Sequence, residues 1–131
     1  SIAAAALEVG PADLMRDLAS FGLLFETLAM RDLRVYVEAL FGEVYHFRDK
    51  QGHECDAVVK IRGGKYGLVE IKLGGGSLIE DGARSLNLLE KLIDTSKSGQ
   101  PAFKMVLTAV GDYAYRRPDG VVVCPIGCLR P

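Results

Sequence analysis

Residues 43–73 read EVYHFRDKQGHECDAVVKIRGGKYGLVEIKL, and this stretch decides the predicted fold. Apolar and polar residues alternate along EVYHFR, HECDAVVKI and YGLVEIKL, and alternation with a period of two residues is typical of β-strands. The segments DKQG and RGGK, which separate the three runs, are rich in turn-forming residues. We therefore expect an antiparallel meander of three strands over 43–73.

Before the meander, the apolar residues recur at helical spacing. Residues 11–20 have Pro11 just inside the expected helix start, and residues 23–42 follow as a longer helical stretch. We expect Gly22 to interrupt or bend the helix and Gly42 to cap its end. The apolar stripe of the longer stretch consists of Phe25, Leu28, Leu33, Val37 and Leu40.

After the meander, a glycine-rich loop at 74–77 leads to a predicted helix over 83–97 and to strands over 102–110 and 120–126. The helix is long enough for a crossover, so the strands that precede and follow it should be parallel. The expected order is α, β, β, β, α, β, β in a single domain over 1–131. This order predicts an α/β fold with a mixed sheet flanked by helices.

The composition is that of a folded globular domain. The chain has 131 residues, of which 49% are hydrophobic and 25% are charged, and this excludes disorder for most of it. A net charge of −1 argues against binding of nucleic acid through bulk charge alone. No apolar run approaches the roughly 18 residues of a membrane span, and no signal peptide is recognisable. Because the 3 cysteines are also odd in number, we expect a cytoplasmic protein without membrane segments.

Four charged residues stand where the hydrophobic patterns predict burial. Asp56 interrupts the second predicted strand, and Glu70 and Lys72 interrupt the third at i, i+2 spacing, so the latter two share one face. Glu26 stands among apolar neighbours in the long helix. Converging carboxylates make an oxygen-rich site suited to Mg²⁺ or Mn²⁺, and a neighbouring lysine can orient a water for attack on a phosphate. This combination indicates metal-assisted hydrolysis of a phosphodiester.

A helical glutamate, then an aspartate, then E-x-K on the next strand resembles the PD-(D/E)XK nuclease superfamily, whose core is αβββαβ. Over nearly the whole chain, four segments look more narrowly like the C-terminal domain of unknown function of predicted bacterial and archaeal AAA-type ATPases. These segments are GLLFETLAMRDL, YHFRDKQGHECDAVV, VEIKLGG and VVVCPIGCL. The resemblance implies a restriction-endonuclease-like core, and a longer parent protein whose ATP-binding module this chain lacks. Cys55 stands where the motif has a proline before its aspartate.

The resemblance also implies a Mg²⁺- or Mn²⁺-dependent nuclease that acts on DNA. Asp56, Glu70 and Glu26 would bind the metal, Glu26 directly or through water, and Lys72 would position the attacking water. One alternative is a catalytically silent accessory domain that binds nucleic acid or a protein partner. Another is a domain that assembles ATPase oligomers, which predicts an exposed apolar patch within residues 1–25.

Several of these residues also have a plainer interpretation. Glu70 and Lys72 could lie on the solvated face of an edge strand, where neighbouring opposite charges are common. Arg116 and Arg117 precede a P-D-G turn and are expected in a solvated loop. The five tyrosines form no stripe, so a base-stacking platform is not expected.

The loop between the second and third strands decides whether the carboxylates meet. A two-residue turn would place Asp56 and Glu70 on opposite faces of the sheet. A loop of 63–65 would pair Asp56 with Lys72, whereas a loop of 62–64 would pair Asp56 with Glu70. We expect one of these two loops or a bulge, since the carboxylates share a face only then.

Overall fold

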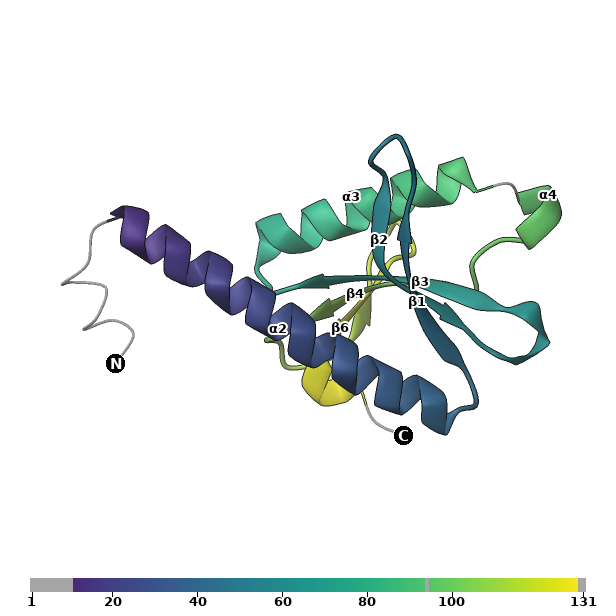
Figure 1. Ribbon diagram of the computed structural model, residues 1–131, viewed down its shortest axis with the longest axis horizontal. Coiled ribbons are helices and arrows are strands. Elements are labelled where there is room, and N and C mark those ends of the chain that lie inside the picture. Colours follow the sequence, from purple (N-terminus) through teal and green to yellow (C-terminus); the bar gives the residue numbers. More distant parts are fainter. Residues whose placement is uncertain (1–10, 94, 130–131) are drawn as a thin grey trace.

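The computed structural model describes residues 11–93 and 95–129 of the chain. Figure 1 shows how the elements are arranged. In chain order, they are α2 (Pro11–Ala39), β1 (Glu43–Arg48), β2 (Glu54–Lys60), the 3₁₀ turn η1 (Arg62–Gly64), β3 (Tyr66–Lys72), α3 (Gly76–Leu92), α4 (Thr95–Ser98), β4 (Phe103–Thr108), β5 (Tyr115–Arg116), β6 (Val122–Pro125) and the 3₁₀ turn η2 (Ile126–Cys128).

The described strands form one six-stranded sheet in the order β1-β2-β3-β4-β6-β5. β1, β2 and β3 are antiparallel neighbours, as the alternating pattern of 43–73 predicts. β3 pairs parallel with β4 across the crossover that contains α3, and β4 pairs parallel with β6. β5 pairs antiparallel with β6. The predicted α/β fold with a mixed sheet flanked by helices is therefore confirmed.

Helices cover both faces of the sheet. Leu33 and Val37 of α2 are buried in one core cluster with Val69 of β3. Leu86 of α3 is buried in a second cluster with Leu68, the residue before Val69. Because successive side chains of a strand point to opposite faces, the two clusters lie on opposite sides of the sheet. The sheet thus separates an α2 layer from an α3 layer, and the end of α2 nearest its N-terminus extends beyond the sheet (Figure 1).

Helix α2 differs from the prediction at its centre and on its apolar face. It continues through Gly22 without a break, so the predicted interruption is wrong. Within the predicted stripe, Leu28 and Leu40 are exposed at 40% and 49%, whereas Ala29, outside the stripe, is fully buried. The buried face follows 29, 33 and 37 at i, i+4 spacing, which a stripe judged by residue type alone does not reveal.

The end of α2 also differs in detail from the prediction. The amide N–H of Gly42 donates to the carbonyl of Val37 and that of Phe41 to Glu38, which is the pattern of a Schellman motif. The left-handed residue of this motif is Phe41 with φ 62°, so Gly42 is not the cap that we expected. Gly42 is required for another reason, since a Cβ there would lie 2.6 Å from the carbonyl oxygen of Lys60. The close approach lets the chain enter β1 directly beside β2.

The second half of the chain departs from the predicted boundaries. Helix α3 begins at Gly76, within the predicted glycine-rich loop, and ends at Leu92. Residues 95–98 form the separate helix α4 instead of continuing α3. Strand β5 was not predicted, because two residues are too short to show a period.

Within residues 11–93 and 95–129, each helix is too short or too polar to span a membrane.

Candidate functional site

The register of β2 against β3 decides the geometry of the candidate site. Ala57 pairs with Val69, and the loop between the strands is the 3₁₀ turn Arg62–Gly64. Ala57 with Val69 is the last pair, and the same register extended by one residue sets Asp56 opposite Glu70. This is the register of the 62–64 loop, so the expectation of an odd-numbered loop is confirmed.

Two glycines make this short loop possible. Gly63 and Gly64 have φ values of 83° and 77°, in the left-handed region that other residues rarely adopt. The loop is closed by the amide N–H of Ile61, which donates to the carbonyl of Lys65 at 2.9 Å. The sequence RGGK therefore selects the register that brings the carboxylates together.

Asp56, Glu70 and Lys72 line one cavity of about 320 Å³ between α3 and the sheet. Glu70 is buried at 7% exposure, and Asp56 and Lys72 are half-buried. The plainer interpretation of Glu70 and Lys72 as residues on a solvated edge strand is wrong, because β3 lies in the interior of the sheet and Glu70 is buried. Glu54, His53 and Ser85 line the same cavity, and the sequence did not point to them as site residues.

Asp56 is held in place by the backbone of β3. Its Oδ2 accepts a hydrogen bond from the amide N–H of Ile71 at 2.8 Å. This side-chain bond follows directly after the last strand pair, Ala57 with Val69. The carboxylate of Asp56 is therefore anchored beside Glu70 by the same strand that carries Glu70.

Burial and the proximity of Asp56 set the protonation of Glu70. Burial, a hydrogen bond with Asp56 and the negative charge of Asp56 together raise the pKa of Glu70 to about 9, against the opposing effect of Lys72. Glu70 is consequently neutral near pH 7 and shares a hydrogen bond with Asp56. Two carboxyl groups that share one proton offer a place where a cation can replace that proton.

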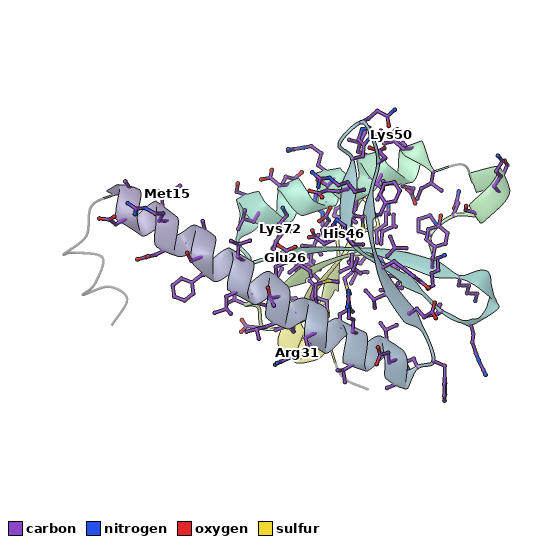
Figure 2. The ribbon with its side chains drawn as sticks, in the orientation of Figure 1. Met15, Glu26, Arg31, His46, Lys50 and Lys72 are labelled. Carbon is purple, nitrogen blue, oxygen red and sulfur yellow. The ribbon has the colours of Figure 1, made fainter. Side chains whose placement is uncertain are left out.

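Glu26 reaches the same region from α2. Partial burial raises the pKa of Glu26, and Asp56 raises it too, while the charges of His46 and Lys72 lower it. Figure 2 shows Glu26, His46 and Lys72 close to the place where α2 crosses the sheet. Glu26 nevertheless lines a different cavity, together with Arg31 and Arg34 of its own helix. The structure thus brings Glu26 within electrostatic range of the cavity that contains Asp56, but not among its lining residues.

His46 contacts the site through a bulge that the sequence does not reveal. The pairing of β1 with β2 shifts between Tyr45 and Phe47, which leaves His46 at the irregular position. One ring nitrogen of His46 lies 3.3 Å from the carbonyl oxygen of Asp56, and the other lies 3.5 Å from Glu54. A motif search by residue spacing assumes regular strands, so it could not have found this residue.

The carboxyl groups of Asp56 and Glu70 fit one mode of divalent-cation binding. Within residues 11–93 and 95–129, no group of three or more His, Cys, Asp or Glu side chains is arranged to hold a metal ion. Asp56 and Glu70 do not form a protein cage with Glu26 in this geometry. Mg²⁺ is, however, commonly bound by one or two carboxylates, with waters and substrate phosphates as the remaining ligands. The paired carboxyls of Asp56 and Glu70 fit this second mode.

A family model described as a domain of unknown function, DUF4143, matches residues 21–129. The chain belongs to the DUF4143 family. The match includes every strand that the structure describes in this DUF4143 domain and all four candidate residues, Glu26, Asp56, Glu70 and Lys72. No curated protein and no solved structure matches the chain.

Proposed function

We propose that this DUF4143 domain is a metal-dependent nuclease of the PD-(D/E)XK type, which hydrolyses phosphodiester bonds in DNA. The observation that carries the proposal is the register of β2 and β3, which sets Asp56 opposite Glu70 in a cavity also lined by Lys72. The order of helix, three strands, helix and strand supports it, because this is the order of the nuclease core.

In this proposal, Asp56 and Glu70 would hold one Mg²⁺ or Mn²⁺ ion, which would stabilise the charge that develops on the phosphate. Lys72 donates a hydrogen bond to the attacking water and orients its lone pair toward phosphorus. The water oxygen forms a new bond to phosphorus and releases one proton to solvent, one phosphorus–oxygen ester bond breaks, and the departing oxygen takes up a proton from solvent. Glu26 completes the arrangement through a water molecule.

The test is cleavage of labelled single- and double-stranded DNA in the presence of Mn²⁺. The proposal predicts cleavage by the wild type, loss of cleavage in Asp56→Ala, and wild-type cleavage in the control Asp32→Ala. Asp32 is an exposed carboxylate of α2 and does not line the Asp56 cavity, so it controls for loss of one negative charge. Cleavage that persists in Asp56→Ala would contradict the proposal.

A second candidate function is supported by the exposed end of α2. Met15, Phe21 and Leu24 of α2 are exposed at 67%, 52% and 55%, and Met15 lies in the part of the helix that extends beyond the sheet (Figures 1 and 2). Exposed apolar side chains of this kind are typical of contact with a partner. They favour an accessory or assembly role beside an AAA-type ATPase module, with or without nuclease activity. Sedimentation velocity of the wild type and of Phe21→Ser/Leu24→Ser would show self-association that the variant loses.

A further inference from the structure

A second cavity adjoins the candidate site on the α3 side of the sheet. It has a volume of about 470 Å³ and is bounded by β2, β3, the loop between them and the segment from α3 into α4. These elements can be followed in Figure 1. Leu89 lines both cavities, while Val58 lies two residues after Asp56, and Leu68 lies two residues before Glu70, on the same faces of their strands. The second cavity therefore continues the candidate site as one groove.

The rim of this groove is basic. Lys60, Lys65 and Lys97 line it, and all three are exposed. None of the three forms an ion pair with the residues that the structure describes, and none of the described lining residues is acidic. Lys60 lies over the ring of Tyr45, 5.1 Å from its centre. In a chain whose net charge is −1, this is a local concentration of unpaired positive charge.

The floor of the groove is apolar and includes two aromatic rings. Phe47 and Tyr66 line it together with Leu68. The hydroxyl of Tyr66 donates to the carbonyl of Gly99 at 2.7 Å, which fixes the orientation of the ring. The absence of a tyrosine stripe in the sequence does not exclude this arrangement, because the two rings come from different strands and different residue types.

We infer that this groove binds a single-stranded polynucleotide and leads it to Asp56, Glu70 and Lys72, an inference that deepens the proposed nuclease function and rests on it. Aromatic and apolar surface beside unpaired lysines matches a strand whose bases are unstacked and whose phosphates are accessible. A duplex hides the faces of its bases, so it would use the lysines but not the floor of the groove.

The experiment measures binding without cleavage. Fluorescence anisotropy in EDTA compares a labelled oligothymidylate with a duplex of equal length, over a series of salt concentrations. The groove variant is Lys60→Ala/Lys65→Ala/Lys97→Ala, and the control is Arg16→Ala/Arg34→Ala/Lys91→Ala. The control removes the same charge from exposed residues that do not line the groove.

The expected result distinguishes binding in the groove from nonspecific attraction to positive charge. The wild type binds the single strand more tightly than the duplex, and the groove variant lowers the slope of log K against log salt by about 2, for three lost phosphate contacts. The control variant keeps most of the wild-type slope. Phe47→Ala weakens single-strand binding about tenfold, through the loss of one stacked base, and leaves duplex binding unchanged.

Three outcomes would overturn the inference. They are equal losses in the groove and control variants, tighter binding of the duplex than of the single strand, and competition by polyglutamate that matches the oligonucleotide. The last outcome would indicate an acidic peptide as the occupant. Because the assay contains no metal ion, single-strand binding by a chain that does not cleave DNA with Mn²⁺ would refute the nuclease proposal alone. Cleavage that is unaffected in the groove variant would refute the groove alone.

Discussion

Two clusters of charged side chains lie at α3, and they differ in how completely their charges are paired. In the first, Lys104 donates to Glu90 and Asn87 at 3.0 and 2.7 Å, while Arg117 pairs with Glu80 and Asp119. In the second, Asp56 and Glu70 share a hydrogen bond beside Lys72 in a cavity. Every charge of the first cluster has a fixed partner, so that cluster ties α3 to β4 and to the turn before β6.

The second cluster does not stabilise the fold, so a structural role does not explain its charged residues. Burial and the neighbouring Asp56 raise the pKa of Glu70 to about 9, which means that the folded chain disfavours the charged form that this side chain has in water. Ionisable side chains with strongly shifted pKa values beside a cavity are typical of functional sites. The comparison therefore predicts that the two clusters respond to substitution in opposite ways.

The largest expected effect is on cleavage, in Lys72→Met. The substitution keeps the aliphatic stem and removes the amine that is proposed to orient the attacking water. We expect the cleavage rate to fall by about a thousandfold, which corresponds to several kcal/mol of transition-state stabilisation. The melting temperature should stay near that of the wild type. A cleavage rate within tenfold of the wild type would show that Lys72 has no role in the reaction.

The matched variant Lys104→Met should show the reverse pattern. Its side chain is 13% exposed, and its loss leaves Glu90 and Asn87 without their shared donor. We expect a loss of about 1–3 kcal/mol in the free energy of unfolding, measured by urea denaturation. Cleavage at a temperature where the variant is folded should be unchanged. Equal stability of Lys104→Met and the wild type would mean that the first cluster does not stabilise the fold.

The protonation of Glu70 predicts a pH dependence of stability. The folded state holds a proton up to about pH 9, whereas the unfolded chain releases it near the ordinary value of 4.5. Between these values the folded state binds more protons, so stability falls as the pH rises, by at most about 1.4 kcal/mol per pH unit. Glu70→Gln should remove this slope and raise the melting temperature at pH 8 in EDTA. Parallel pH profiles for the two proteins would contradict the burial of a neutral Glu70.

The smallest expected effect is the change in the free energy of unfolding when an exposed ion pair of α3 is removed. Arg84 and Asp81 pair at 3.3 Å with side chains exposed at 71% and 52%. Exposed pairs of this kind contribute about 0–1 kcal/mol, so Arg84→Ala should change the free energy of unfolding far less than Lys104→Met. A loss as large as that of Lys104→Met would show that burial does not distinguish the pairs of α3.

The sequence predicted which candidate residues share a face of the sheet, because side chains alternate between the two faces along a strand. The E-x-K spacing placed Glu70 and Lys72 on one face, and the odd-loop requirement reduced the register of Asp56 to a few possibilities. The choice among them depended on the conformation of Gly63 and Gly64, which composition alone does not specify.

Other features depended on contacts between distant residues, which no local pattern contains. The pair of Arg117 with Glu80 joins residues far apart in the chain, and it makes the expected solvated loop wrong for Arg117, whose side chain is 19% exposed. Arg116 is exposed, but it lies in strand β5 and not in a loop. The bulge at His46 and the two-residue strand β5 likewise have no period to detect. The exposed apolar residues of α2 were predicted only as one alternative, a patch within residues 1–25, and residues 1–10 of that segment lie outside the described part of the chain.

The most direct test of the central claim is a calorimetric titration of Mn²⁺ into the wild-type chain and into Asp56→Ala, with Asp32→Ala as control. The account predicts one saturable site in the wild type and in the control, and no binding in Asp56→Ala at an unchanged circular dichroism spectrum. Absence of saturable binding in a folded wild type, or equal binding in Asp56→Ala, would contradict a metal site formed by Asp56 and Glu70.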